Sequence, residues 1–126
     1  MFANWAPPLK VFLNGSVEEL KTHYNELSKK YGFEVVPPYA IISAVGQQHM
    51  QKKRIKEAIK VFEYYITVYP NAVDGRFSLV QAYLDDGQIE KAKDTLKEVS
   101  TLSPENKRAR EWLNSLKNNH WFYCLY

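Results

Sequence analysis

The sequence predicts an all-α protein, a right-handed solenoid of about six helices in which helix-turn-helix pairs repeat along the chain. The prediction depends on small, ring-bearing and proline positions that recur at one interval. This interval is 34 residues, and the pairs are Ala58 with Ala92, His49 with Tyr83, and Pro70 with Pro104. Arrays of such repeats usually bind or scaffold rather than catalyse. We therefore expect a binding or assembly protein.

Composition agrees with a folded and soluble chain. The 126 residues are 45% hydrophobic and 14% aromatic, which suits one compact domain or a short solenoid and argues against disorder. The 17 basic and 14 acidic residues are interleaved, so the net charge of +3 does not predict a nucleic-acid partner. No apolar run approaches the roughly 20 residues of a membrane span, and the start lacks a secretory signal. We expect a soluble protein, cytoplasmic by default.

The chain opens with a segment rich in aromatic residues and proline, residues 1–15, consistent with the end of an upstream domain. Residues 16–38 are predicted to form a helix and a linker. Ser16 and Glu19 have the spacing of a capping box, and Gly32 suits the left-handed position that ends a helix. Between them, large apolar residues recur at helical spacing, at Leu20, Tyr24, Leu27 and Tyr31.

Two helical hairpins are expected next, at residues 39–72 and 73–106. The first has helices at about 39–51 and 55–69, and the second at about 73–85 and 89–102. Lys52–Arg54 forms the first turn, and Asp86-Gly87 forms the second because glycine accepts a positive φ. A helix at 107–118 caps the array with Ala109, Trp112, Leu113 and Leu116 on one face, and an aromatic tail at 119–126 follows.

These recurring positions resemble the tetratricopeptide repeat. The matching residues are Gly46, Ala58, Phe62 and Pro70 in the first frame, and Tyr83, Ala92, Leu96 and Pro104 in the second. We expect Gly46 against Ala58 to let two helix axes approach closely, with Phe62 filling the wider part of the wedge. The chain departs from the pattern at His49, Tyr65, Val80 and Val99.

A second resemblance covers about residues 2–104. The run from His23 to Phe33 is similar to a helix pattern, H-Y-x-x-L-S-x-x-Y-G-[FY], in the C-terminal extension of certain bacterial esterases of the α/β-hydrolase superfamily. That resemblance implies an accessory region of a larger esterase-like protein, with the chemistry elsewhere. Its alternative is that the chain completes the active site of an ester hydrolase.

Residues that could carry chemistry have simpler structural explanations. The chain has no G-x-S-x-G motif, and Gly15-Ser16 is interpreted as a helix cap. The three histidines, His23, His49 and His120, lack the i, i+4 spacing of paired metal ligands. Cys124 is single and has no basic neighbour that would favour a thiolate. We expect no catalysis, no metal and no cofactor.

Partner binding is the predicted function. The family's inner surface is built from the first helix of each hairpin, where the chain mixes amide, carboxylate and apolar side chains. The predicted groove residues are Ser43, Gln47, Met50, Asp74, Phe77, Gln81 and Leu84. The family's clamp for a C-terminal carboxylate requires lysine and asparagine where this chain has Ser43 and Gln47, so that ligand is not expected.

Two other surfaces are kept as alternatives. Lys52, Lys53, Arg54 and Lys56 form a basic cluster that is either a solvated turn or an anion-binding surface. The tail from His120 to Tyr126 is too apolar to be left in water. It either folds back near Trp112 and Leu116 or inserts into a second copy and makes a homodimer. The partner is thus a protein, a peptide, an attached hydrolase domain or another copy.

Overall fold

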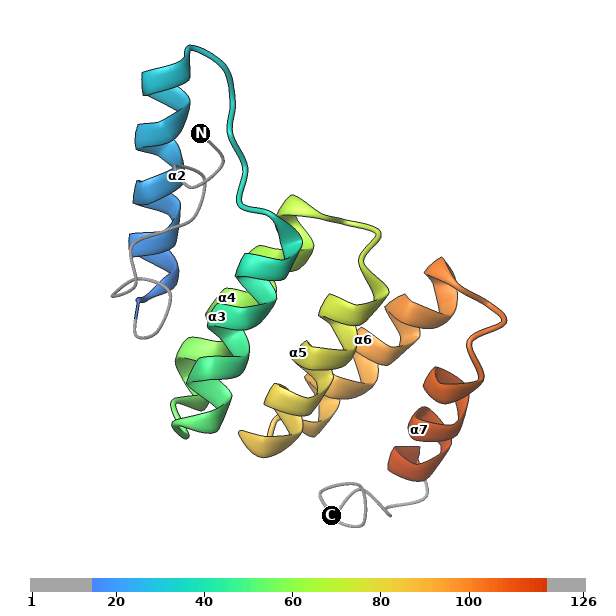
Figure 1. Cartoon of the computed structure of the whole chain (residues 1–126). Helices are drawn as coiled ribbons and strands as arrows, with labels where there is room; N and C mark the ends of the chain where they lie inside the picture. Colours follow the sequence, from blue (N-terminus) through green and yellow to red (C-terminus); the bar gives the residue numbers. More distant parts are fainter. Residues whose placement is uncertain (1–14, 118–126) are drawn as a thin grey trace. The chain divides into compact units, whose positions relative to one another are not determined.

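A computed structural model describes residues 15–117, and all regular structure in that range is α-helical (Figure 1). The chain divides into two compact units, Met1–Pro70 and Asn71–Tyr126. The helices of the first unit are α2 (Val17–Tyr31), α3 (Tyr39–Gln51) and α4 (Ile55–Val68). Those of the second unit are α5 (Val73–Asp85), α6 (Ile89–Leu102) and α7 (Lys107–Lys117). The predicted all-α class with helical repeats is confirmed. The tail at 119–126 lies outside the described residues, as do residues 1–14.

Helix α2 begins and ends at the expected residues. The Glu19 amide donates to the Ser16 hydroxyl at 3.3 Å, which caps one of the free N–H groups of the first turn. Gly32 closes the helix with a φ of 75°, a conformation that costs glycine nothing. The apolar stripe is buried at Leu20, Tyr24 and Leu27, so α2 is an amphipathic helix packed on the rest of its unit.

The linker between α2 and α3 is held by specific hydrogen bonds. The amide of Val35 donates to the Ser28 hydroxyl at 2.7 Å, and this hydroxyl donates to the Tyr24 carbonyl at 2.9 Å. Farther along, the hydroxyl of Tyr69, the residue that follows α4, donates to the Pro37 carbonyl at 2.8 Å. The extended linker is therefore tied both to the helix before it and to the hairpin after it.

The first hairpin packs α3 against α4 through a glycine facing a phenylalanine. A methyl group added at Gly46 would lie 2.6 Å from Cζ of Phe62, well inside van der Waals contact. The ring of Phe62 is the nearest group over Gly46, and the expected contact of Gly46 with Ala58 stays a prediction. Ala58 and Phe62 are both fully buried in the same hairpin. Glycine is thus needed to accommodate an aromatic ring.

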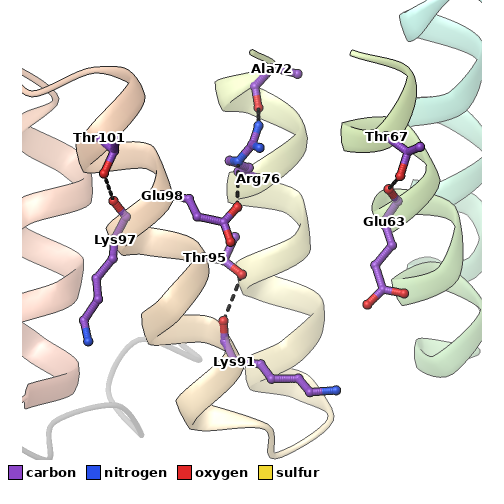
Figure 2. Close-up of polar contacts among 9 residues, drawn as sticks. All are labelled: Glu63, Thr67, Ala72, Arg76, Lys91, Thr95, Lys97, Glu98 and Thr101. Carbon is purple, nitrogen blue, oxygen red and sulfur yellow. Dashed lines mark hydrogen bonds and ion pairs between the residues drawn. The ribbon is translucent and has the colours of Figure 1, made fainter. Parts of the chain in front are cut away.

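The second hairpin adds an ion pair between its helices. Arg76 of α5 contacts the Glu98 carboxylate of α6 at 3.1 Å and also donates to the Ala72 carbonyl at 3.2 Å (Figure 2). The Arg76 side chain is only 11% exposed but that of Glu98 is 53% exposed, so water still screens one side of this pair. After α6, the Asn106 side chain accepts a hydrogen bond from the Ala109 amide at 2.9 Å and thereby caps the start of α7.

The backbone repeats its hydrogen bonds 34 residues apart. In the first turn the Arg54 amide donates to the His49 carbonyl at 2.8 Å, and in the second the Gln88 amide donates to the Tyr83 carbonyl at 2.8 Å. The hydrogen bonds at the ends of α4 and α6 repeat as well. The Tyr69 amide donates to the Tyr65 carbonyl at 2.9 Å, and the Ser103 amide donates to the Val99 carbonyl at 2.8 Å. The two hairpins therefore share one local design.

The repeat also places Lys53 where the second turn has Gly87. Their φ angles are 64° and 78°, so a lysine occupies the left-handed region. Replacing Lys53 with glycine should raise the free energy of unfolding by about 0.5–1 kcal/mol, because the Cβ strain exceeds the added entropy of the unfolded chain. Urea unfolding measures the change. Lys52→Gly, at a φ of −90°, is the matched control and should destabilise; equal effects of both glycines would contradict the prediction.

Candidate functional site

The predicted groove residues of the first unit lie on α3. Ser43 and Met50 are partly buried and Gln47 is exposed, so this helix presents a mixed surface to solvent. All three stay predicted binding residues.

On α5, two of the four predicted groove residues are buried. Asp74 is exposed and Gln81 is partly buried, but Phe77 is only 8% exposed and Leu84 only 2%. This corrects the expectation that Phe77 offers a free apolar group. The reason is α7, whose Trp112 stacks on the Phe77 ring with centroids 6.1 Å apart and planes at 10°.

Arg108 completes this aromatic stack. Its guanidinium carbon lies 4.4 Å from the centroid of the Phe77 ring and 5.6 Å from that of Trp112. A guanidinium is attracted to the negative face of an aromatic ring, and its flat shape covers the ring from water. Phe77 is therefore part of the core of the second unit, beneath Arg108 and Trp112.

Beside the stack lies an open hollow of about 340 Å³, which we call the Trp112 depression. Its lining residues are Gln81, Arg108, Glu111, Trp112 and Ser115. The indole N–H of Trp112 is buried and has no hydrogen-bond partner among residues 15–117. A buried donor without an acceptor costs roughly 1–3 kcal/mol.

Sequence reasoning assigned Trp112 only to the packing face of a cap. The 34-residue spacing could have revealed more, because it relates Ser115 to the predicted groove residues Gln47 and Gln81. Helix α7 thus stands where the first helix of a third hairpin would begin. Its groove-facing position is held by Ser115, which lines the depression together with Gln81.

His49 of the first hairpin connects α3 to the residue before Ser16, the cap of α2, by a hydrogen bond. His49 is 2% exposed, and its Nε2 lies 2.7 Å from the Gly15 carbonyl, which precedes α2. Arg54 Nε donates to its Nδ1 at 2.9 Å, so Nε2 carries the proton and donates to Gly15. His49 is therefore a core residue, as is Tyr83, its counterpart 34 residues later.

Two tyrosines of the first unit have raised pKa values. Burial raises the pKa of Tyr24 to about 12 and also raises the pKa of Tyr64, so both phenols stay protonated near neutral pH. Between residues 15 and 117 there is no group of three or more His, Cys, Asp or Glu side chains that could hold a metal ion. His120 and Cys124 lie outside this range.

Helices long and apolar enough to cross a bilayer are absent from the described residues. Comparison with known families gives one match, in which the model of the tetratricopeptide repeat matches residues 49–116, more than half of the chain. The matched range includes α7. No match was found among the curated proteins or the solved structures. The esterase resemblance therefore stays a prediction.

Proposed function

Because this chain belongs to the tetratricopeptide repeat family, we propose that it acts by binding another protein, with the Trp112 depression receiving a segment of that partner. Tetratricopeptide repeats generally mediate protein–protein interaction and are typically non-catalytic. The family thus supplies the class of function. The location of the contact on α5 and α7 is our own proposal.

One observation carries this location. The Trp112 depression joins a tryptophan, an arginine, a glutamate, a glutamine and a serine from two helices. Tryptophan and arginine are the residues that most often supply binding energy in protein interfaces. The Arg108 guanidinium supplies N–H donors at this site, so a peptide backbone carbonyl is a suitable ligand group.

An attached esterase-like domain is one partner that we infer from the resemblance described above. Within that pattern, Tyr24 and Leu27 are buried, Ser28 ties the linker, and Gly32 ends α2. Each of these four residues has a structural role in the first unit. This supports an accessory region in which these residues serve folding, with any ester chemistry in another domain.

The proposal is tested with a random-peptide display library selected against the full chain. We expect enriched peptides to bind about tenfold more weakly to Gln81→Ala and to Arg108→Ala than to the unaltered chain, since each substitution removes a donor from the depression. Arg110→Ala is the matched control, because Arg110 is an exposed arginine of the same helix that does not line the depression.

Melting curves verify that each variant is folded before binding is compared. The proposal is wrong if selection enriches no peptide, or if enriched peptides bind all three variants as they bind the unaltered chain. A peptide that depends on Arg110 as strongly as on Arg108 would indicate attraction by net charge alone.

A further inference from the structure

Most polar side chains of the Trp112 depression are engaged within the chain. The Gln81 amide group donates to the Asp85 carboxylate at 2.9 Å. The Ser115 hydroxyl donates to the Glu111 carbonyl at 3.1 Å. The Glu111 carboxylate contacts the Lys107 ammonium group at 3.7 Å. Gln81, Ser115 and Glu111 therefore each have a polar partner on their own helix.

Arg108 differs from these lining residues because its contacts are with rings. Its guanidinium carbon lies 4.4 Å from the centroid of the Phe77 ring and 5.6 Å from that of Trp112. No hydrogen bond or ion pair joins the Arg108 side chain to another residue in the range 15–117. The Arg108 side chain is also exposed. Its guanidinium N–H groups are thus the donors of the depression that a ligand can reach and that no described residue uses.

A guanidinium in this setting suits a carboxylate. Its fork of N–H donors matches the two oxygens of a carboxylate, and such pairs are frequently bidentate. Contact with two rings restricts the Arg108 side chain before a ligand arrives, so binding has less side-chain freedom to remove. Because the residue is exposed, water weakens the pair, and the expected preference over a neutral group is modest.

We propose that the partner segment received by the Trp112 depression is acidic, with the side-chain carboxylate of an aspartate or glutamate bound by Arg108. This inference rests on the function proposed above and adds the chemistry of the ligand. The carboxylate belongs to a side chain within the segment. A C-terminal carboxylate is not expected, because Ser43 and Gln47 stand where the family's clamp for a chain end requires lysine and asparagine.

Glu111 gives the proposal an opposite and independent consequence. Its carboxylate is 66% exposed and lines the same depression, so it repels an acidic ligand. Replacing Glu111 with glutamine removes this repulsion and should strengthen binding of an acidic peptide about twofold. A ligand held by neutral groups alone would bind this variant as it binds the unaltered chain.

The test uses the full chain and the peptides enriched from the display library. Enriched sequences should share an aspartate or glutamate at one position. Each peptide is synthesised with an amidated C-terminus in two forms, one with the acidic residue and one with the corresponding amide residue. The amide form should bind the unaltered chain about fivefold more weakly.

Arg108→Gln keeps a long side chain with a flat end and should bind the two forms equally, because the group that distinguishes them is gone. Arg110→Gln is the matched control, since Arg110 is exposed on the same helix and does not line the depression. This control should keep the fivefold difference between the two forms.

The outcomes separate this inference from the function on which it rests. Peptides that need Gln81 and Arg108 but bind equally in both forms would overturn the inference and leave the proposed function intact. The inference is also wrong if binding requires a free C-terminal carboxylate, or if Glu111→Gln weakens binding of the acidic form. Loss of the difference in Arg110→Gln as well as in Arg108→Gln would indicate attraction by net charge alone. A library that enriches no peptide would remove both proposals.

Discussion

Replacing Phe77 with alanine is expected to lower the free energy of unfolding by about 3 kcal/mol, because the substitution removes a buried ring from beneath Trp112 and Arg108. Phe77 is 8% exposed, and its ring makes both the parallel stack and the closer of the two contacts with the guanidinium. Urea unfolding followed by circular dichroism measures the loss. Any effect of this variant on partner binding would then be an indirect result of lost packing.

Gln81→Ala is the control for the Phe77 variant, because Gln81 is on the same helix and lines the Trp112 depression without being core. It should change stability by less than about 0.5 kcal/mol. If Phe77→Ala is as mild as Gln81→Ala and selectively weakens peptide binding, Phe77 is a binding residue and the assignment to the core is wrong.

Replacing Gly46 with alanine is expected to destabilise the chain, although alanine is the better helix former. Helix propensity favours alanine over glycine by about 1 kcal/mol. Against this, the new methyl would lie 2.6 Å from Cζ of Phe62, a ring that is fully buried and has no solvent into which to turn. Overpacking of this kind costs about 1–3 kcal/mol, so we expect a net loss of up to about 2 kcal/mol.

A double-mutant cycle separates this steric cause from others. Phe62→Leu shortens the side chain that opposes Gly46, so Gly46→Ala should cost less in the Phe62→Leu background than in the unaltered chain. Thermal or urea unfolding of the four proteins gives the interaction energy. Additive effects would show that the glycine is required for a reason other than the ring of Phe62.

The bounds of the helices could be predicted well, because capping residues, glycines and apolar periodicity act within a few residues along the chain. The spacing of Ser16 and Glu19 predicted the start of α2. Gly32 predicted the end of α2 and Gly87 the second turn, since glycines in the left-handed conformation terminate helices. The expected bounds of three helices agree with α3, α5 and α6, and α4 ends at Val68, one residue before the expected end. Periodicity along one helix suffices for such predictions.

Contacts between helices could not be predicted to the same degree. The interval of 34 residues aligned Gly46 and Ala58 with the repeat, but it did not tell which side chain of α4 enters the space over Gly46. Nor did the pattern show that Trp112 covers Phe77, or that His49 reaches back to Gly15. These depend on side-chain directions across elements, which sequence spacing alone does not determine.

An experimental structure of the full chain by crystallography or NMR tests most directly whether the two hairpins are one repeated unit. We predict that residues 39–72 superpose on residues 73–106 helix on helix, with His49 on Tyr83, Ala58 on Ala92, and a positive φ at both Lys53 and Gly87. Hairpins that superpose only in another register, or β-structure in either range, would contradict the account.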